Sequence, residues 1–116
     1  MIRVWLQRRP DGALVGFAVR GHSGLRRSGH DIVCAAVSVL TQTVAVGLER
    51  QVGVNVRVRA GDGELVCTLP DGLSPSELRR CQDLMETMCL GLREVALAYP
   101  RRLQLCEGAH DSSVGS

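Results

Sequence analysis

The sequence predicts an α+β fold, in which two helices cover one mixed five-stranded sheet in a two-layer domain of order ββαββαβ. Three observations favour this fold. Five short segments alternate between apolar and polar residues, as half-buried strands do. Two longer segments have apolar residues at helical spacing and begin with residues typical of helix starts. The chain has 116 residues, enough for a single core and too few for two.

The first two strands form a predicted hairpin. Apolar and polar residues alternate over residues 2–8. Residues 10–12 read Pro-Asp-Gly, which predicts a turn because proline presets the first corner and glycine accepts a positive φ. The second strand is expected over residues 13–20. Its core face is expected to carry Val15, Phe17 and Val19.

The first helix is expected over residues 32–51, after a glycine- and serine-containing loop at 21–29. Asp31 is its expected N-cap, because a carboxylate there accepts hydrogen bonds from first-turn amides. Gly53 is the expected stop. Residues 32–37 are apolar on nearly every side, which predicts burial against the sheet and a further element.

The second half repeats the pattern of hairpin and helix. Strands are expected at 54–60 and 64–69, with Val54, Val56 and Val58 facing the core. A second helix begins at the Ser74 cap, with proline in its first position, and runs to about Tyr99. A last strand is expected at 101–106. Residues 1–106 then form a single domain, and residues 107–116 a polar, disordered tail.

Composition and charge narrow the functional classes. The net charge is +2 and aromatic residues make up 3%, which disfavours nucleic acid as the main ligand. All basic residues are arginine, which excludes lysine Schiff-base chemistry. No secretory signal is visible, and the apolar stretch 32–48 is interrupted by polar residues and judged too short for a membrane span. A cytoplasmic protein without a membrane partner is expected.

Five cysteines are an odd number without a Cys-x-x-Cys pair. This disfavours both a disulfide framework and structural zinc. Four of the five lie on predicted core faces and are interpreted as packing residues. These four are Cys67, Cys81, Cys89 and Cys106.

Cys34 and His22 are the candidate catalytic residues. Cys34 lies in the first turn of the expected helix, where the dipole and free amides favour a thiolate. Cysteines in such positions have pKa values of about 3.5–7.5, against about 8.5 for a free cysteine. If the loop folds His22 back onto Cys34, the imidazole could take and return the proton. The first-turn amides could bind an oxyanion.

Structural alternatives remain open for each of these residues. Cys34 could be a small buried apolar residue, His22 a strand-end histidine held by a backbone hydrogen bond, and Asp31 only a cap. Ser38, one turn after Cys34, could face the site or bond to a backbone carbonyl. A metal held by Cys34 and the histidines at positions 22 and 30 lacks an obvious fourth ligand.

These residues carry a resemblance to a known family. Gly21-His22, a glycine-bearing loop and the segment DIVCAAVS at 31–38 resemble the ribosomal-processing cysteine protease family Prp, over about residues 1–106. The resemblance implies a cytoplasmic, homodimeric endopeptidase that needs no cofactor, with Cys34 as nucleophile and His22 as general base. Asp31 and Ser38 are then the implied substrate-binding residues.

The same resemblance implies a substrate. Family members remove a short N-terminal extension from a large-subunit ribosomal protein, number twenty-seven in the usual scheme, and the loop between the dyad residues orders when substrate binds. The expected partner is therefore a ribosomal protein precursor, with no direct nucleic-acid contact. The alternative hypothesis is a non-enzymatic ribosome-associated binding module in which Cys34 is buried.

Overall fold

The computed structural model describes residues 1–21, 32–61 and 63–109 and confirms the predicted α+β fold. Its five strands form one sheet in the order β3-β4-β2-β1-β5. The β1–β5 pair is parallel and the other pairs are antiparallel, so the sheet is mixed. The elements are β1 (Ile2–Arg8), β2 (Leu14–Arg20), α1 (Ile32–Gly47), the π-helical turn η2 (Leu48–Val52), β3 (Arg57–Gly61), β4 (Glu64–Thr68), α2 (Pro75–Ala98) and β5 (Leu103–Ala109).

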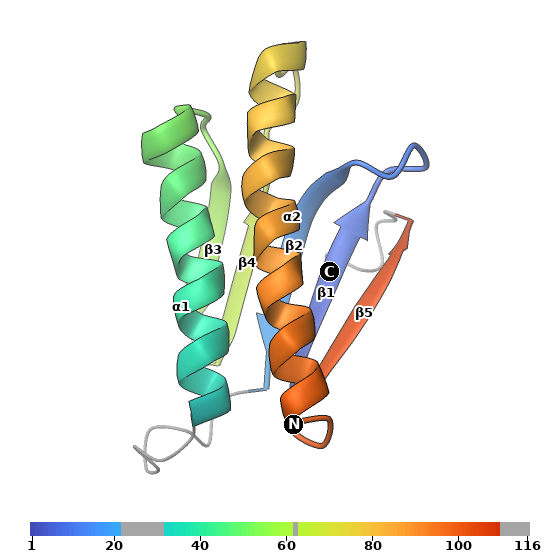
Figure 1. Ribbon diagram of the computed structural model, residues 1–116. Coiled ribbons are helices and arrows are strands. Elements are labelled where there is room, and N and C mark those ends of the chain that lie inside the picture. Colours follow the sequence, from blue (N-terminus) through green and yellow to red (C-terminus); the bar gives the residue numbers. More distant parts are fainter. Residues whose placement is uncertain (22–31, 62, 110–116) are drawn as a thin grey trace.

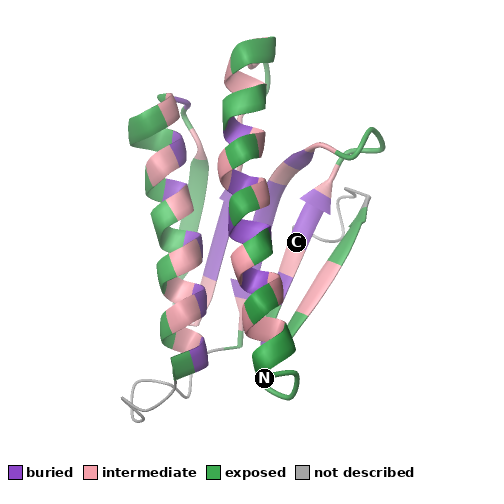
Figure 2. Ribbon diagram, in the orientation of Figure 1, coloured by how far each residue is buried: buried purple, intermediate pink, exposed green. Residues whose placement is uncertain are grey.

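Both helices lie on the same face of the sheet and enclose the core between them and the strands (Figure 1). Buried residues line the inner sides of the helices and the sheet beneath them (Figure 2). On β1, Ile2, Val4 and Leu6 are buried as the alternation predicts. From α2, Met85 and Leu92 fill the layer opposite them. Burial of these apolar side chains is the main stabilising contribution to the fold.

The start of α2 follows directly from its local sequence. Ser74 accepts a hydrogen bond from the Glu77 backbone N–H at 3.1 Å, and the Glu77 side chain accepts one from the Ser74 backbone N–H at 2.9 Å. Pro75 occupies the first helical position, where no intrahelical donor is needed. This reciprocal capping confirms the predicted start, and the helix ends at Ala98 beside the predicted end.

A bulge in β2 changes which of its side chains face the core. Gln7 pairs with Gly16 and Arg8 with Leu14, so Val15 has no partner on β1. Leu14 is therefore buried with Phe17, while Val15 is only half-buried, and the predicted inward position of Val15 is wrong. Strict alternation fails here because a bulge adds one residue to one strand.

The strand after α1 begins later than predicted. α1 ends in the π-helical turn η2, which Gly53 terminates with a φ of 87°, and strand pairing starts at Arg57. Val54 is buried. Val58 pairs with the buried Cys67 and so lies on the face that the alternation predicts, but at the edge of the sheet it is 48% exposed. β3 is an edge strand, and α1 leaves part of it uncovered.

The first turns of α1 are also more exposed than predicted. Val33 and Val37 are buried, but Ile32 is 59% exposed. The prediction that residues 32–37 are buried on most sides is therefore wrong. The side of α1 that faces away from the sheet and α2 is exposed. One helical face can pack on a sheet while the opposite face meets solvent.

The apolar helix at residues 32–52 also corrects an argument made from sequence. It has 21 residues, and an 18-residue window within it has a mean hydropathy of 1.7, so by length and composition it could cross a membrane. The statement that this stretch is too short for a span is therefore wrong. In this fold one side of the helix packs on the sheet, with Val33, Val37 and Leu48 buried.

The last strand is longer than predicted and turns one cysteine away from the core. β5 extends to Ala109, so residues 107–109 belong to the sheet, and the rest of the expected tail lies outside the described residues. Leu103 faces the core, whereas Cys106 pairs with Trp5 on the face away from the helices and is half-buried. The predicted core position of Cys106 is therefore wrong.

A charged network joins β1, α2 and β5 at the side of the core. Arg8 contacts Glu86 at 2.7 Å and Glu107 at 3.1 Å, and Arg93 contacts Glu107 at 3.0 Å. The Arg8 hydrogen bond lowers the pKa of Glu86. Burial acts to raise the pKa of Glu107, but hydrogen bonds from Arg93 and Arg8 outweigh it, and the net shift is downward.

We expect this network to make the fold sensitive to acid. A glutamate has an ordinary pKa of about 4.3 in the unfolded chain. Because both carboxyl groups have lower pKa values in the fold, their stabilising contribution is present above about pH 4.3 and is lost as the pH falls through the folded values. Urea unfolding at pH 6 and pH 3 should show lower stability at pH 3. Glu86→Gln with Glu107→Gln should reduce that loss, and an unchanged loss in the double variant would contradict this assignment.

Candidate active site

Cys34 lies where the sequence predicts it, as the third residue of α1 and in its first turn. It is half-buried and packs against the edge of the core. The Ser38 hydroxyl, one turn further along the helix, lies 3.7 Å from the Cys34 sulfur. Both side chains are therefore on one side of α1, and the predicted proximity of Ser38 to Cys34 is confirmed.

The environment of Cys34 differs from that of three other cysteines. Cys67, Cys81 and Cys89 are buried in the core, as the sequence predicts. Burial raises the pKa of Cys67 and of Cys89 to about 11 and also raises that of Cys81. These three thiols are therefore held neutral at physiological pH. All five cysteines belong to the described part of the chain, and none forms a disulfide.

Gly21 fixes the path of the chain toward the other predicted catalytic residue. It has a φ of 95°, and its N–H donates to the Gly63 carbonyl at 3.2 Å. A side chain at this position would meet the carbonyl oxygen of Met1. The end of β2, which Gly21 follows, lies at the same end of the domain as the start of α1 (Figure 1). His22 and Asp31 themselves lie outside the described residues, so their predicted roles stay predictions.

Residues 1–104 match the family model of the cysteine protease Prp. The chain belongs to the Prp family of cysteine proteases. It is thereby a cysteine peptidase by family, as its sequence motif indicates. Over 107 residues it is 24% identical to the ribosomal processing cysteine protease Prp of Bacillus subtilis, covering 90% of this chain and 96% of that protein.

Solved structures show the same fold. The ribosomal processing protease Prp from S. aureus, in complex with a substrate peptide, superposes with a TM-score of 0.80 at 20% identity, covering 93% of this chain and all of that one. The protein SMU.848 from Streptococcus mutans superposes with a TM-score of 0.76 at 28% identity, covering 95% of this chain and 96% of that one. These likenesses agree with the two-layer fold described above.

Acidic, cysteine and histidine side chains are the possible metal ligands of this Prp family member. Among residues 1–21, 32–61 and 63–109, no three such side chains gather closely enough to hold an ion. The alternative metal site predicted from His22, His30 and Cys34 depends on two histidines outside these ranges. Cys34 is thus the one member of that set whose position is described.

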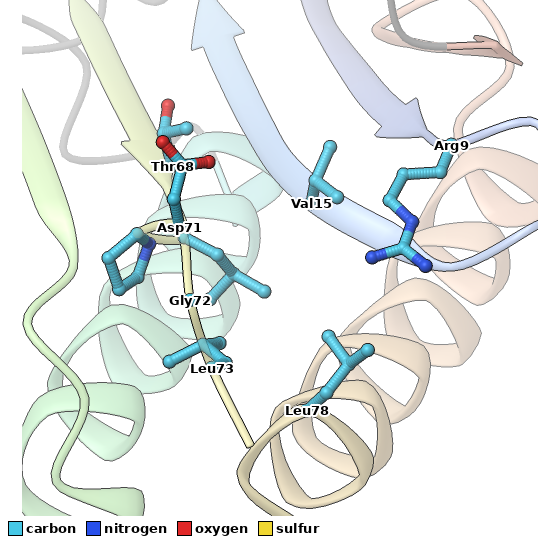
Figure 3. A pocket seen from close by; sticks show the side chains of 9 residues that line it. Arg9, Val15, Thr68, Asp71, Gly72, Leu73 and Leu78 are labelled. Carbon is cyan, nitrogen blue, oxygen red and sulfur yellow. The ribbon is translucent and has the colours of Figure 1, made fainter. Parts of the chain in front are cut away.

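A pocket lies at the end of the sheet away from Cys34. It has a volume of about 320 Å³ and is lined by Val15 from the start of β2, Leu69 after β4 and Leu78 in α2, with Arg9 and Asp71 on its sides (Figure 3). β2 runs from this pocket toward the end of the domain where α1 begins (Figure 1). By strand rise, Val15 and Gly21 are separated by about 20 Å. This pocket is therefore separate from the Cys34 site of the Prp fold.

A second hollow, which sequence reasoning missed, lies between α1 and β3 on the same side of the helix as Cys34. Its volume is about 300 Å³, and Ala45, Val46, Val58 and Leu65 give it apolar walls. Alternation had assigned Val58 to the core, so no local signal marked it as part of a surface hollow. The hollow exists because α1 does not cover the edge of β3, and only the structure shows this.

Proposed function

We propose that this Prp family member is an endopeptidase that removes the N-terminal extension of a bacterial large-subunit ribosomal protein during ribosome maturation. Its catalytic groups are a dyad of Cys34 and His22, with Asp31 and Ser38 contacting the substrate. The observation that carries this proposal is the part-buried Cys34 in the first turn of α1, 3.7 Å from Ser38, within a chain that matches the family over residues 1–104. The curated relative from Bacillus subtilis bears the name ribosomal processing cysteine protease.

The proposed reaction uses the start of α1 twice. The positive end of the helix favours the Cys34 thiolate, which attacks the scissile carbonyl and forms a carbon–sulfur bond. First-turn N–H groups stabilise the oxyanion of the tetrahedral intermediate. Protonated His22 gives its proton to the leaving amine as the peptide bond breaks. Water, deprotonated by His22, then hydrolyses the thioester; the Cys34 thiolate leaves and His22 is again protonated, as at the start.

The competing function is a ribosome-associated binding module with a buried Cys34. The exposure of the thiols argues against it. Cys67, Cys81 and Cys89 are buried, as packing residues are, whereas Cys34 is only half-buried at the rim of the helix layer. Cys34 also lies in the first turn of α1, where a thiolate is favoured, and a packing role does not require that position.

Incubation with a substrate precursor tests the two functions against each other. The precursor is large-subunit ribosomal protein twenty-seven of a bacterium whose version carries an N-terminal extension. We expect the mass of the precursor to fall by that of the extension, with one new N-terminus. Binding of the precursor without any change of its mass would support the binding module and contradict the peptidase.

We also propose that the protein is a homodimer and acts in the cytoplasm. Exposed apolar side chains on both helices support association: Val39 on α1 is 65% exposed, and Leu90 and Leu97 on α2 are 61% and 76% exposed. The five cysteines are free thiols, which fits the reducing conditions of the cytoplasm. Light scattering on the eluting protein should give twice the monomer mass of 12.5 kDa, and a monomer at micromolar concentration would contradict the dimer.

A further inference from the structure

One side of α1 leads from Cys34 to the hollow between α1 and β3. Cys34, Ser38, Gln42, Ala45 and Glu49 follow one another at intervals of three or four residues, so they form one row along the helix. Gln42, Ala45 and Glu49 also line the hollow. The row therefore begins at the candidate nucleophile and ends at an apolar depression.

The walls of the hollow are apolar although they meet solvent. Val46 on α1 is 49% exposed and Val58 on β3 is 48% exposed, while Ala45 and Leu65 are nearly buried beneath them. Its volume of about 300 Å³ lies at the small end of the range for ligand pockets. Such a hollow fits one aliphatic side chain with part of its backbone, and its lining also includes the polar side chains of Gln42, Glu49 and Arg50.

β3 supplies a surface for an extended peptide beside this hollow. It is the edge strand of the sheet and pairs only with β4 within the described part of the chain. α1 lies alongside it (Figure 1). Backbone groups on the outer side of an edge strand can pair with an added peptide strand, while alternate side chains of that peptide enter neighbouring pockets.

We propose that the hollow between α1 and β3 is a substrate subsite that takes an aliphatic side chain about five residues from the scissile bond. This inference rests on the proposed function, because it places the scissile bond at Cys34. Ala45 lies eleven positions after Cys34, which is about 17 Å at the rise of an α-helix. An extended peptide covers that distance in about five residues.

A series of tethered probes measures the distance between the Cys34 sulfur and the hollow directly. Iodoacetyl-(Gly)n-Leu-amide, with n from 0 to 8, alkylates Cys34 when the thiolate displaces iodide and forms a thioether. In a second series the peptide runs in the opposite chain direction. Leucine is at its N-terminal end and the iodoacetyl group is attached at its C-terminal end. The protein carries Cys106→Ser, because Cys106 is only half-buried, and peptide mass mapping identifies the labelled residue.

We expect the alkylation rate to have a maximum near n = 4 in one of the two directions, about tenfold above the rate at n = 0. Replacing the terminal leucine by aspartate should abolish the maximum. Val46→Asp and Val58→Asp should each abolish it too, without changing the rate with plain iodoacetamide. Val39→Asp is the matched control, since Val39 is exposed on α1 but does not line the hollow. A rate independent of n in both directions, or a maximum that survives both substitutions, would overturn the subsite.

The two proposals fail in different ways. If plain iodoacetamide does not label Cys34 at neutral pH, the proposed nucleophile is wrong. A second measurement then still tests the subsite. The Cys34→Ala protein is titrated with acetyl-(Gly)4-Leu-amide and followed through its ¹⁵N spectrum. We expect the largest shifts at Val46 and Val58, and shifts that avoid both residues would overturn the subsite.

Discussion

Replacing Cys34 with alanine is expected to abolish cleavage of the extended ribosomal protein precursor. Removing the nucleophile removes the covalent route, so the rate should fall by a factor of about 10³ or more. His22→Ala should cause a comparable loss, because an unassisted thiol neither keeps its charge nor protonates the leaving amine. Effects of groups that act as a unit are not additive, so the double variant should be little worse than either single variant.

The control for this experiment is a different cysteine. Cys106 is half-buried beside Trp5 on the face away from the helices, so Cys106→Ser should keep nearly full activity. Unfolding of each variant in urea should show that the fold is retained, since Cys34 lies at the rim of the core. Cleavage by Cys34→Ala at the wild-type rate would contradict the dyad.

Replacing Gly21 with alanine is expected to have the largest effect on folding among the loop positions. Its φ of 95° disfavours any residue with a side chain, and the added Cβ would press against the Met1 carbonyl oxygen. Backbone strain and the contact together should lower the free energy of unfolding by about 3 kcal/mol. Because His22 is the next residue in the chain, relaxation of this strain should also reduce the rate of cleavage.

Gly72 offers a matched control for Gly21→Ala. It also has a positive φ, of 77°, but a Cβ there would meet no atom within 4 Å. Gly72→Ala should therefore cost only the conformational strain, about 1 kcal/mol, and leave cleavage unchanged. The difference between the two variants, measured by urea unfolding, isolates the contact with Met1. Equal losses in both would contradict the close approach at Gly21.

Features encoded by neighbouring residues could be predicted from the sequence. The Ser74 cap and Pro75 define the start of α2 through contacts within a few residues, and Gly53 ends η2 where the pattern stops. The placement of Cys34 and Ser38 on one side of a helix follows from their spacing alone. Local chemistry is sufficient for such features because their partners are only a few residues away.

Features that depend on distant partners could not be predicted in this way. The exposure of Val58 depends on how far α1 reaches over the edge of the sheet, and the position of Val15 depends on a bulge against β1. The hollow between α1 and β3 was missed for the same reason, because its two sides come from elements whose relative placement no local pattern fixes. The position of His22 relative to Cys34 likewise depends on the path of a loop, and the spacing of the two residues in the sequence does not determine that path. The outward position of Cys106, by contrast, follows from alternation with Leu103 and Leu105 in its own strand, and its assignment to the core overlooked that pattern.

The most direct test of the central claim is the rate at which iodoacetamide alkylates Cys34 as the pH is varied. A sulfur kept anionic by the start of α1 and by a nearby imidazolium should already react at close to its maximal rate at pH 7. The midpoint of its pH profile should then lie well below the value of about 8.5 for an ordinary cysteine, and His22→Ala should move it upward. A midpoint near 8.5 that is the same with and without His22 would contradict the account.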